Sequence, residues 1–523
     1  MAQQKSENPI VPEGRGNTPR TGLRRGGKGV PVNPEDGQLE LGFATAESPR
    51  GTARERVVGR PTPRPDAAPK AKSKEEGSHL ATLESVVASL DEALHDVVRN
   101  KGAPGPDGLT VEDARDQWPT LRDRLATQLT HGNYQPGPIR RVEIPKPDGG
   151  VRTLGIPNVV DRIVQAALKR VLERVWEPTF DPSSHGFRPL RSCHTALSEA
   201  CQYLDEGYEW MVDLDLSKFF DRVHHQRLMA RIAQRVTDRG LLVVVGRVVG
   251  SEVVLPSGVC VRSEEGVPQG GPLSPLLSNI VLDELDQELR RRGHRFVRYA
   301  DDVSIFVRSE RAGHRVMGSI TRFIEKRLRL KVNTEKSSVR RPDRGNFLGF
   351  SMKPGGPDGR VEVTLSERTL KRAYSRIREL TPRNWGGSLG ACIRRLGVYL
   401  VGWFGYFKGC TEGARRQFNN LDAHIRRRLR AIQLKHWKRK RVIARKLLRM
   451  KASRKVRPSI YGGRRSLWVL SNLGVVTHRL SKAWFAELGL PYVLDLFWNE
   501  HVKRVAPAPE VARRQMSLPL VRG

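Results

Sequence analysis

Two adjacent acidic residues interrupt an otherwise apolar segment, and they constrain the fold more than any other feature of the sequence. Asp301 and Asp302 stand at the centre of FVRYADDVSIFVRS (296–309), between two runs of residues that favour β-strands. Neighbouring carboxylates repel each other and resist burial, so a folded chain keeps them between strands where a ligand compensates them. The pattern predicts a strand–turn–strand unit whose tip enters a site; the alternative is an exposed hairpin turn.

A second acidic strand lies upstream, in EWMVDLDLSKFFDRVHH (209–225). Strand alternation places Asp213 and Asp215 on one face. Pairing of this strand with the first one would bring its acids beside Asp301 and Asp302, and three carboxylates at one place repel each other unless a cation neutralises them. Ligand sets made of oxygen favour Mg²⁺ or Mn²⁺. Two such ions can clamp a phosphoryl group during its transfer.

The net charge indicates an anionic partner. The chain has 92 Lys and Arg residues against 56 Asp and Glu, a formal charge of +36. Nucleic acid is the favoured partner, and an anionic membrane surface is the alternative. No apolar run is long enough to span a bilayer, and the N-terminal segment lacks the apolar core of a signal peptide. The five cysteines include no CxxC pair, which fits a reducing compartment. We therefore expect a cytoplasmic protein with no membrane partner.

Composition divides the chain into five parts. Residues 1–78 are rich in Gly, Pro, Arg and Ser and are predicted to form a disordered basic tail. Residues 79–365 alternate between helical and strand patterns, whereas residues 366–457 are almost wholly helical and very basic. We assign residues 458–505 to a small C-terminal nucleic-acid-binding module and residues 506–523 to a flexible tail.

Two further motifs suit a site that holds phosphates. RRVEIPKPDGGVRTLGIP (140–157) predicts a hairpin whose turn is flanked by Lys146 and Arg152, where they could grip a triphosphate. The alternative for these two cations is a solvated hairpin tip. EEGVPQGGPLSPLLSNIVLDELDQEL (264–289) begins as a Gly/Pro loop and ends as an amphipathic helix, and its glycines would let the backbone approach a ligand closely.

Nine motifs occur in the order that is typical of one family. They are NKGAPGPDG, IPKPDGGVRTLGIP, DRIVQAAL, SSHGFRPLRSCHTAL, DLDLSKFFD, PQGGPLSP, YADD, LKVNTEKS and FLGF. With them, residues 80–352 resemble the fingers and palm of a reverse transcriptase of the group II intron-encoded type. The basic region that follows, with YLVGWFGYF, resembles the family's thumb or maturase domain. We therefore assign residues 79–365 to the fingers and palm and residues 366–457 to the thumb or maturase domain. The resemblance implies an α+β fold: a right-hand polymerase with an antiparallel palm sheet, followed by an all-α basic domain.

The resemblance also chooses among the upstream acids. The family's first metal-binding acid lies five positions before the second aromatic of its FF pair, which selects Asp215 and pairs it with Phe220. Asp213 and Asp221 are the rejected alternatives. In the family this aromatic lies under the sugar of the incoming nucleotide, where its bulk would exclude a 2′-hydroxyl and favour deoxynucleotides. The alternative is that Phe220 is a core residue.

The remaining roles follow from matching positions in the family. Asp301 and Asp302 match the other two catalytic acids, and with Asp215 they would hold two Mg²⁺ ions, or Mn²⁺ in their place. The resemblance assigns contacts with the incoming nucleotide to Lys146, Arg152, Phe220 and Gln269, and a position near the primer end to Lys336.

The implied function is an RNA-directed DNA polymerase that binds its intron RNA, assists splicing as a maturase and copies the intron during retrohoming. Its partners would be intron RNA, a DNA target, an RNA template–primer duplex and deoxynucleoside triphosphates. No cysteine follows Cys410, so we do not expect the His/Cys-rich endonuclease of many relatives. The alternatives are a splicing-only maturase and a domesticated reverse transcriptase in phage defence or CRISPR spacer acquisition. The intact Asp215, Asp301 and Asp302 argue against a decayed polymerase.

The segment 424–457 is basic throughout and contains no Asp or Glu. A solvated helix normally mixes charges to gain pairs four residues apart, so the self-repulsion here must be offset by bound phosphate. We predict binding of structured intron RNA, in a protein associated with the bacterial nucleoid or a ribonucleoprotein; the alternative is a nonspecific nucleic-acid patch. The candidate RNA-binding residues are Arg426, Arg427, Arg428, Lys438, Arg439 and Lys440.

Overall fold

The computed structural model describes most of the chain except its two ends. The predicted ligand Lys146 and almost all of the predicted tails, 1–78 and 506–523, lie outside the described residues. Within the first tail, β1 (Gln4–Lys5) pairs with β2 (Gly42–Phe43) in antiparallel fashion. The described residues are 4–5, 42–43, 81–145, 150–262, 265–356, 359–450, 452, 455–463 and 465–505.

The chain divides into two compact units, Met1–Arg341 and Pro342–Gly523. This division places residues 342–365, which we assigned to the palm, with the helical part of the chain. The reason is local, because β11 (Phe350–Lys353) and β12 (Glu362–Leu365) form their own two-stranded sheet.

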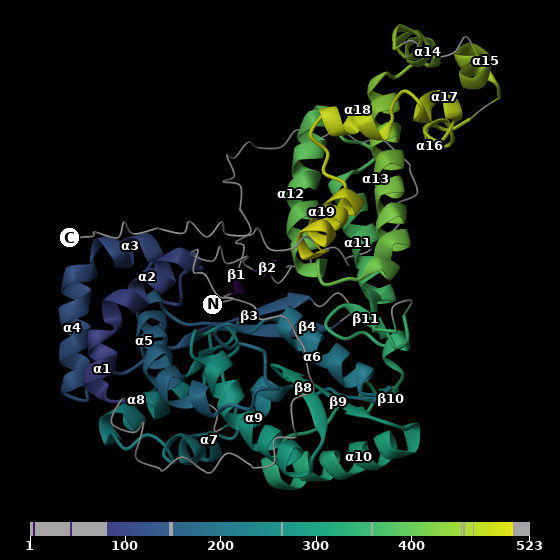
Figure 1. Ribbon diagram of the computed structural model, residues 1–523. Coiled ribbons are helices and arrows are strands. Elements are labelled where there is room, and N and C mark those ends of the chain that lie inside the picture. The colour runs from purple at the N-terminus through teal and green to yellow at the C-terminus, as the bar shows by residue number, and fades with distance from the viewer. Residues whose placement is uncertain are drawn as a thin grey trace, which may run out of the picture. The chain divides into compact units, whose positions relative to one another are not determined.

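The first unit opens with a helical layer built around α5 (Val159–Trp176). Most side chains of α5 are buried, and α1, α2 and α3 pack against it. The first helices begin at polar caps: the Thr110 side chain accepts the Asp113 N–H in a capping box that starts α3. The other helices of this layer are α1 (Leu83–Ala88), α2 (Leu90–Asn100), α3 (Val111–Asp116), α4 (Trp118–Thr130), α7 (His225–Ile232) and α8 (Arg239–Val249) (Figure 1).

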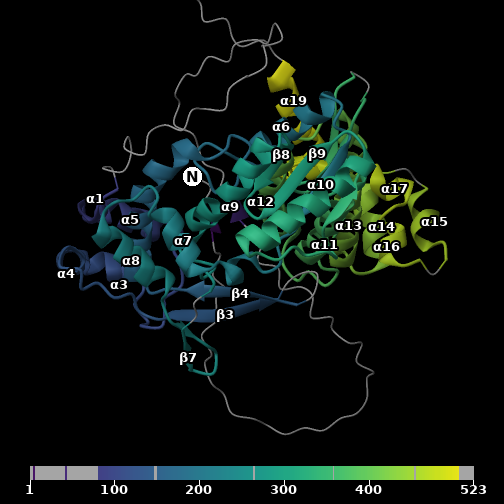
Figure 2. The same ribbon diagram turned by 90° about the horizontal axis from the view of Figure 1, so that it is seen from below.

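A four-stranded sheet next to these helices contains the predicted hairpin. β3 (Ile139–Pro145) and β4 (Val151–Ile156) pair in antiparallel fashion, with Arg140 opposite Ile156, so the hairpin is confirmed. β3 also pairs in parallel with the short β6 (Val253–Val254), and β7 (Cys260–Val261) completes the order β4-β3-β6-β7. Figure 2 shows β3 and β4 side by side, with β7 beyond them.

The second sheet of this unit is the predicted antiparallel palm sheet. Its order is β10-β5-β9-β8, and all three pairings are antiparallel. α6, α9 and α10 pack against it (Figure 2). Apolar side chains of β5, β8 and β9 enter the main hydrophobic core. The elements are α6 (Cys193–Asp205), β5 (Trp210–Leu214), α9 (Ser274–Arg291), β8 (Arg295–Tyr299), β9 (Asp302–Val307), α10 (Glu310–Phe323) and β10 (Ser338–Arg340), with the short 3₁₀ helices η2 (Glu177–Thr179) and η3 (Phe219–Arg222) and the π-helix η4 (Ile324–Leu328).

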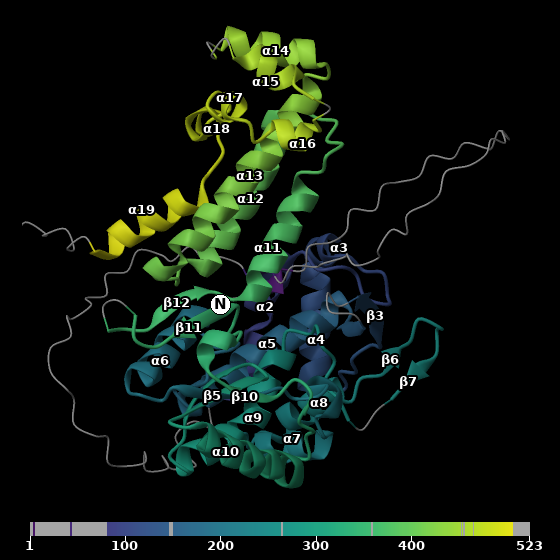
Figure 3. The same cartoon turned by 90° about the vertical axis from the view of Figure 1, so that its right-hand side faces the viewer.

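The second unit is helical after β12, as predicted, so the expected α+β class is confirmed. α12 (Leu389–Phe407), α13 (Arg415–His436) and α19 (Val493–Val505) pack together (Figure 3). Aromatic rings lie between them, where Phe418 contacts Phe404 and Phe497. No helix among the described residues is long and apolar enough to cross a membrane. The other elements are η5 (Pro342–Arg344), α11 (Glu367–Leu380), η6 (Glu412–Ala414), α14 (Lys440–Arg449), α15 (Val456–Tyr461), α16 (Leu467–Leu470), α17 (Gly474–Thr477) and α18 (Lys482–Glu487).

Candidate active site

Strand register brings the two acidic segments together. β8 and β9 are joined by a two-residue turn, Ala300 and Asp301, and Ala300 adopts the left-handed conformation at φ 58°. β5 pairs with β9 so that Leu214 stands opposite Val303. The next residue along β5 is Asp215, which therefore lies beside Asp302. The predicted strand–turn–strand unit and its pairing with the upstream acidic strand are both confirmed.

Burial and repulsion between carboxylates raise the pKa values of Asp301 and Asp302. Desolvation by the surrounding protein, together with repulsion from Asp301 and Asp215, raises the pKa of Asp302 to about 7, and Lys336 opposes the shift. Asp302 is nevertheless exposed to solvent. Burial also raises the pKa of Asp301, with a further contribution from Asp215, and Arg152 opposes the shift. The negative charge here exceeds what the neighbouring cations neutralise, which is an electrostatic condition for attracting a cation.

Asp213 and Asp215 differ in their partners. Asp213 accepts a hydrogen bond from Ser304 Oγ at 2.8 Å and forms an ion pair with Arg340, two contacts that act against the effect of burial on its pKa. The Asp215 carboxylate lies 4.0 Å from Lys336 Nζ, and it makes no closer ion pair with any other described residue. Asp221, the third candidate, is exposed on η3. The geometry thus favours Asp215 as the acid available to a ligand, in agreement with the prediction.

The donor set fits a hard divalent cation. Asp215, Asp301 and Asp302 offer carboxylate oxygens, the ligands that Mg²⁺ and Mn²⁺ prefer, and Arg152 and Lys336 compensate their repulsion only in part. No group of three or more His, Cys, Asp or Glu residues in the described part of the chain is arranged to hold a metal ion. The three acids are therefore neighbours without forming a closed ligand shell.

A buried arginine holds the acidic turn from behind. Arg298 and Asp286 are both 0% exposed, and Arg298 Nε donates to Asp286 Oδ1 at 2.7 Å. Arg298 Nη1 donates to the Ala300 carbonyl at 3.0 Å and to Asn279 Oδ1 at 2.8 Å, while Nη2 donates to Ser184 Oγ at 2.7 Å. Sequence reasoning missed this residue. Its signal was a charged side chain between the apolar Val297 and the acidic turn, inside a strand with a buried face.

The SSHGF segment supports the same turn through its backbone. The His185 N–H donates to the Arg298 carbonyl at 2.8 Å, and Asn279 Nδ2 donates to the Gly186 carbonyl at 2.9 Å. A Cβ atom at Gly186 would overlap the backbone nitrogen of Ala300, so glycine is required by this close approach. The turn that carries the acids is thus fixed by α9, by β8 and by residues 184–186.

The predicted nucleotide-binding residues Arg152 and Gln269 touch each other. Arg152 Nε donates to Gln269 Oε1 at 3.3 Å, and the Gly155 N–H donates to the Gln269 carbonyl at 2.6 Å. Gly270 has φ 125°, and a Cβ atom there would overlap the Gly155 carbonyl oxygen. These contacts join the hairpin to the PQGG loop, and the role of Arg152 and Gln269 in nucleotide binding stays a prediction.

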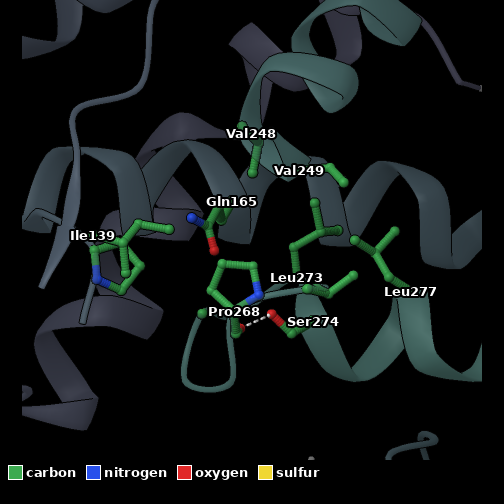
Figure 4. A pocket seen from close by; sticks show the side chains of 11 residues that line it. Ile139, Gln165, Val248, Val249, Pro268, Leu273, Ser274 and Leu277 are labelled. Atoms are coloured by element: carbon green, nitrogen blue, oxygen red, sulfur yellow. Dashed lines mark hydrogen bonds between the residues drawn. The ribbon is translucent and has the colours of Figure 1, made fainter. Parts of the chain in front are cut away.

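The base of the PQGG loop is packed rather than open. Ser274 Oγ donates to the Pro268 carbonyl at 2.7 Å, and the side chains of Ile139, Gln165 and Leu273 surround a cavity of about 10 Å³ (Figure 4). A space of this size holds at most about one water molecule. The residues packed around this cavity therefore support the loop. The cavity is too small for a nucleotide, which would have to bind on the other side of the loop.

Phe220 is connected to the same loop. Its neighbour Phe219 is buried in the core, and the two rings make an edge contact with centroids 5.2 Å apart, while Phe220 itself is half-buried. The Val267 N–H donates to the Phe220 carbonyl at 2.7 Å, and the Gly266 N–H donates to the Val223 carbonyl at 2.8 Å. This placement distinguishes a core Phe219 from a Phe220 that retains an exposed surface, so the role of Phe220 beneath the sugar stays a prediction.

The three consecutive arginines of α13 make three different sets of contacts. Arg426 lies over the Tyr492 ring at 5.6 Å, and Arg427 lies over the Trp468 ring at 4.1 Å. Arg428 donates from Nε to Thr381 Oγ1 and from Nη2 to the Thr381 carbonyl, each at 2.5 Å. Successive helical residues point about 100° apart, so these three cannot form a single surface. Their role in RNA binding stays a prediction, and Arg428 also links α13 to the end of α11.

The second basic group lies at the junction of α13 and α14. Lys438 and Arg439 are exposed between the two helices, and Lys438 adopts the left-handed conformation at φ 60°. Lys440 Nζ donates to the Gly463 carbonyl at 2.9 Å. Lys438 and Arg439 are thus the members of the predicted set that present their charges most openly to a partner.

Two protein families match successive parts of the chain. Residues 144–352 match the family described as "Reverse transcriptase (RNA-dependent DNA polymerase)", and residues 370–451 match "Group II intron, maturase-specific domain". The first match includes all three acids and the PQGG loop. The second includes α12, α13 and α14.

Curated relatives give the same picture. Protein YkfC of Escherichia coli (strain K12) is 32% identical over 357 residues, which are 60% of this chain and 91% of that protein. The group II intron-encoded protein LtrA of Lactococcus lactis subsp. cremoris is 36% identical over 197 residues, 37% of this chain and 32% of LtrA. The Retron Mx65 reverse transcriptase of Myxococcus xanthus is 31% identical over 221 residues, 38% of this chain and 47% of that protein. The matches thus span less than half of the last two relatives.

Proposed function

The chain belongs to the family of group II intron-encoded proteins that join a reverse transcriptase to a maturase domain, and we propose that Asp215, Asp301 and Asp302 are its catalytic acids. The membership predicted from nine ordered motifs is confirmed. Within this family the chain is an RNA-directed DNA polymerase with a maturase function. The proposal concerns the residues, ions and partners through which it acts.

One observation carries the assignment of the acids. The register of β5 on β9 puts Asp215 beside the turn that bears Asp301 and Asp302, and the pKa values of Asp301 and Asp302 are raised by burial and by repulsion from neighbouring carboxylates. Charges of the same sign are brought together at a point where Arg298 holds the backbone in place. Such an arrangement is costly unless a cation binds there, which supports a catalytic site and argues against a chance cluster.

Reverse transcriptases use divalent metal ions, and we assign two Mg²⁺ ions, or Mn²⁺ in their place, to these three acids. When bound, such ions activate the primer's 3′-hydroxyl and neutralise charge on the phosphates in transfer. The chain itself supplies the placement: β5 and the turn between β8 and β9 hold the carboxylates, and Lys336 lies 4.0 Å from Asp215 on the side that we assign to the primer end.

The incoming deoxynucleoside triphosphate is proposed to bind against the hairpin and the PQGG loop. Arg152, with Lys146 outside the described residues, would contact the phosphates, and Gln269 would lie beside the nucleotide. The hydrogen bond from Arg152 to Gln269 supports a shared surface. Phe220, joined by its carbonyl to Val267 of the same loop, would lie beneath the sugar.

The helical unit is proposed to bind intron RNA and to assist splicing, with Lys438 and Arg439 as its most exposed contacts. The template–primer duplex and the DNA target site are the further partners expected when the intron is copied during retrohoming. The match to the maturase-specific domain over residues 370–451 supports this role over phage defence or spacer acquisition.

The experiment that tests the catalytic assignment is the Asp302→Asn substitution. The variant removes one charge from the acidic turn while keeping its shape, so extension of a DNA primer on an RNA template should fall by roughly three orders of magnitude or more. The protein should melt at the same temperature or higher, because a repelling carboxylate is gone. Splicing of the intron RNA in the presence of the variant should continue.

The matched control is Asp213→Asn, which changes another acid of the same sheet. Asp213 is paired with Arg340, so this variant should lose stability and keep most of its primer extension. Extension by the Asp302→Asn protein at the wild-type rate would overturn the assignment of the acids. Equal losses in the two variants would mean that sheet stability, rather than chemistry, was measured.

A further inference from the structure

A polar cavity in the helical unit has no role in the function proposed so far. One face of α13 lines it with Asn419, Asp422, Arg426 and Arg430, residues spaced by three or four positions. The opposite wall comes from the segment around α17 and α18 and includes Lys482. The cavity volume is about 350 Å³, within the range of small-molecule and cofactor sites.

Arg430 lines this cavity and has an unpaired donor. The residue is only 6% exposed, its Nε donates to the Arg426 carbonyl at 3.2 Å, and its Nη1 is buried with no hydrogen-bond partner. Burial, together with repulsion from Arg426 and Arg427, lowers the pKa of Arg430 to about 10. A buried guanidinium nitrogen without an acceptor is unfavourable, so the site lacks an anionic partner for this group.

The other charges of the cavity leave it positive. Arg426 lies four residues before Arg430 on the same helix, a spacing at which like charges repel. Asp422 is the one carboxylate among the described lining residues, and its two oxygens accept the N–H groups of Val493 and Leu494 at 3.0 Å each, where α19 begins. Lys482 forms an ion pair with Asp495. Asp422 offsets part of the charge of Arg426, but neither arginine forms an ion pair with a carboxylate among the described residues.

We propose that this cavity binds a phosphate group, with Arg430 Nη1 and the Arg426 guanidinium as its donors, and that the phosphate belongs to the backbone of the intron RNA. Guanidinium groups are suited to phosphate because their N–H donors match its oxygens and remain charged. The RNA source rests on the proposed maturase function, whereas the phosphate chemistry rests on the cavity alone. A volume of about 350 Å³ admits a phosphate together with adjoining sugar.

The phosphate chemistry is tested on the full chain with inorganic phosphate as the probe. At equal ionic strength, phosphate should raise the melting temperature of the wild-type protein above its value in chloride by about 2–4 °C at roughly five times the Kd. Arg430→Gln should abolish this difference. The matched control is Arg416→Gln, the same change at an exposed position of α13, which should retain it.

A second readout separates a ligand role from a structural one. Without phosphate, Arg430→Gln should melt no lower than wild type, because the variant loses a buried, unpaired charge that Arg426 repels. Phosphate protection that persists in Arg430→Gln would overturn the site. A large fall in its melting temperature without phosphate would likewise overturn it, since Arg430 would then be a structural residue.

The source of the phosphate is tested by phosphorothioate interference on the intron RNA. Sulfur at the bound phosphate should weaken binding to wild type and to Arg416→Gln by roughly tenfold, the effect of one charge-assisted hydrogen bond. The same sulfur should have no effect with Arg430→Gln. If every interference position survives in Arg430→Gln while inorganic phosphate still protects wild type, RNA is overturned as the source and a free phosphate compound takes its place.

Failure of the proposed maturase function would give a different result from failure of the phosphate site. A wild-type chain that bound no intron RNA at low salt would contradict the maturase assignment, and the melting experiment with inorganic phosphate would still decide whether the cavity binds phosphate. Loss of phosphate protection in both Arg430→Gln and Arg416→Gln would contradict the phosphate site in the cavity and leave the maturase assignment standing.

Discussion

The acidic turn of the first unit and the basic helix α13 of the second unit are organised in opposite ways. The acids stand next to one another in sequence and also in space, because strand register and a two-residue turn place them. The arginines at 426–428 are also consecutive, yet each contacts a different partner: Tyr492, Trp468 or Thr381.

This difference follows from backbone geometry. A turn between two paired strands projects neighbouring side chains into one region, whereas a helix rotates each successive residue by about 100°. A run of like charges in a helix is therefore distributed among several environments. In this chain one arginine stacks, one joins two helices, and Arg430 further along lines a cavity.

The largest effect is expected where the acidic turn is supported. Arg298→Met should cost about 3–5 kcal/mol of unfolding free energy, because it leaves Asp286 buried without its partner. Pairing it with Asp286→Leu should restore most of that stability. The double variant should still extend a primer roughly a hundredfold more slowly, since nothing then holds the Ala300 carbonyl, and small misplacements of catalytic groups are costly.

The control is Arg295→Met on the same strand, where an exposed ion pair with Glu206 at 3.7 Å should be worth about 0–1 kcal/mol. Chemical denaturation and primer extension measure the two effects. A double variant that regains both stability and activity would show that Arg298 stabilises the fold without positioning the turn. The contrast with α13 would then lose its structural basis.

The sequence was sufficient to predict the acidic site because its determinants are local. Alternation within β5, the YADD turn and the family motifs are enough to place Asp215, Asp301 and Asp302 together, and the strand register agrees. The support behind them was not predicted. Arg298 meets Asp286 and Ser184 across the fold, and no spacing in the sequence indicates which buried acid a buried arginine will contact.

In the basic region, the sequence predicted the type of structure but not the contacts of individual residues. Its composition correctly predicted a helical unit, and residues 370–451 match the maturase-specific domain. Composition could not reveal that Arg428 is committed to Thr381, or that Arg430, absent from the predicted set, lacks a partner for Nη1. Those outcomes depend on which helices pack against each face of α13, which the charge pattern alone does not specify.

A smaller effect is expected at the aromatic beside the PQGG loop. Phe220→Ala should open space beneath the sugar and lower the preference for deoxy over ribo substrates by roughly one to two orders of magnitude. Single-nucleotide extension with each substrate measures the ratio. Phe219→Leu is the control: it should reduce stability and leave the ratio unchanged, because Phe219 is buried. An unchanged ratio in Phe220→Ala would make both residues core residues.

Different residues of the basic region should respond differently to mutation. In the double variant Lys438→Gln with Arg439→Gln, the slope of log K for RNA binding against log salt concentration should become shallower by about 1.5–2. The melting temperature should stay unchanged, because both residues are exposed. Arg428→Gln should instead lose about 1–3 kcal/mol of unfolding free energy with little change in slope, since its donors bind Thr381. If the variants changed the salt slope of RNA binding equally and lost no stability, all three residues would contact RNA in the same way.

The smallest effect concerns His424, which tests whether α13 is packed on this side as tightly as the contacts indicate. Its ring makes edge contacts with Tyr374 and Trp468, at centroid distances of 5.0 and 6.4 Å. Burial lowers the pKa of His424 to about 4, and the nearby Arg428, Arg378 and Arg427 act in the same direction. The folded protein therefore resists a proton that the unfolded chain accepts at its usual pKa near 6.5.

Stability should accordingly be fully present above pH 6.5 and should decline as the pH falls from 6.5 towards 4, because protons bind the unfolded chain first. His424→Gln removes this titration, so the difference in melting temperature between pH 7 and pH 5 should be smaller in the variant than in wild type. Asp422, whose pKa burial raises to about 6, titrates in the opposite sense but is present in both proteins and cancels in the comparison. If the melting temperatures of the two proteins declined in parallel, the His424 ring would be open to solvent. This face of α13 would then be free to bind RNA, as the acidic turn is free to bind its ions.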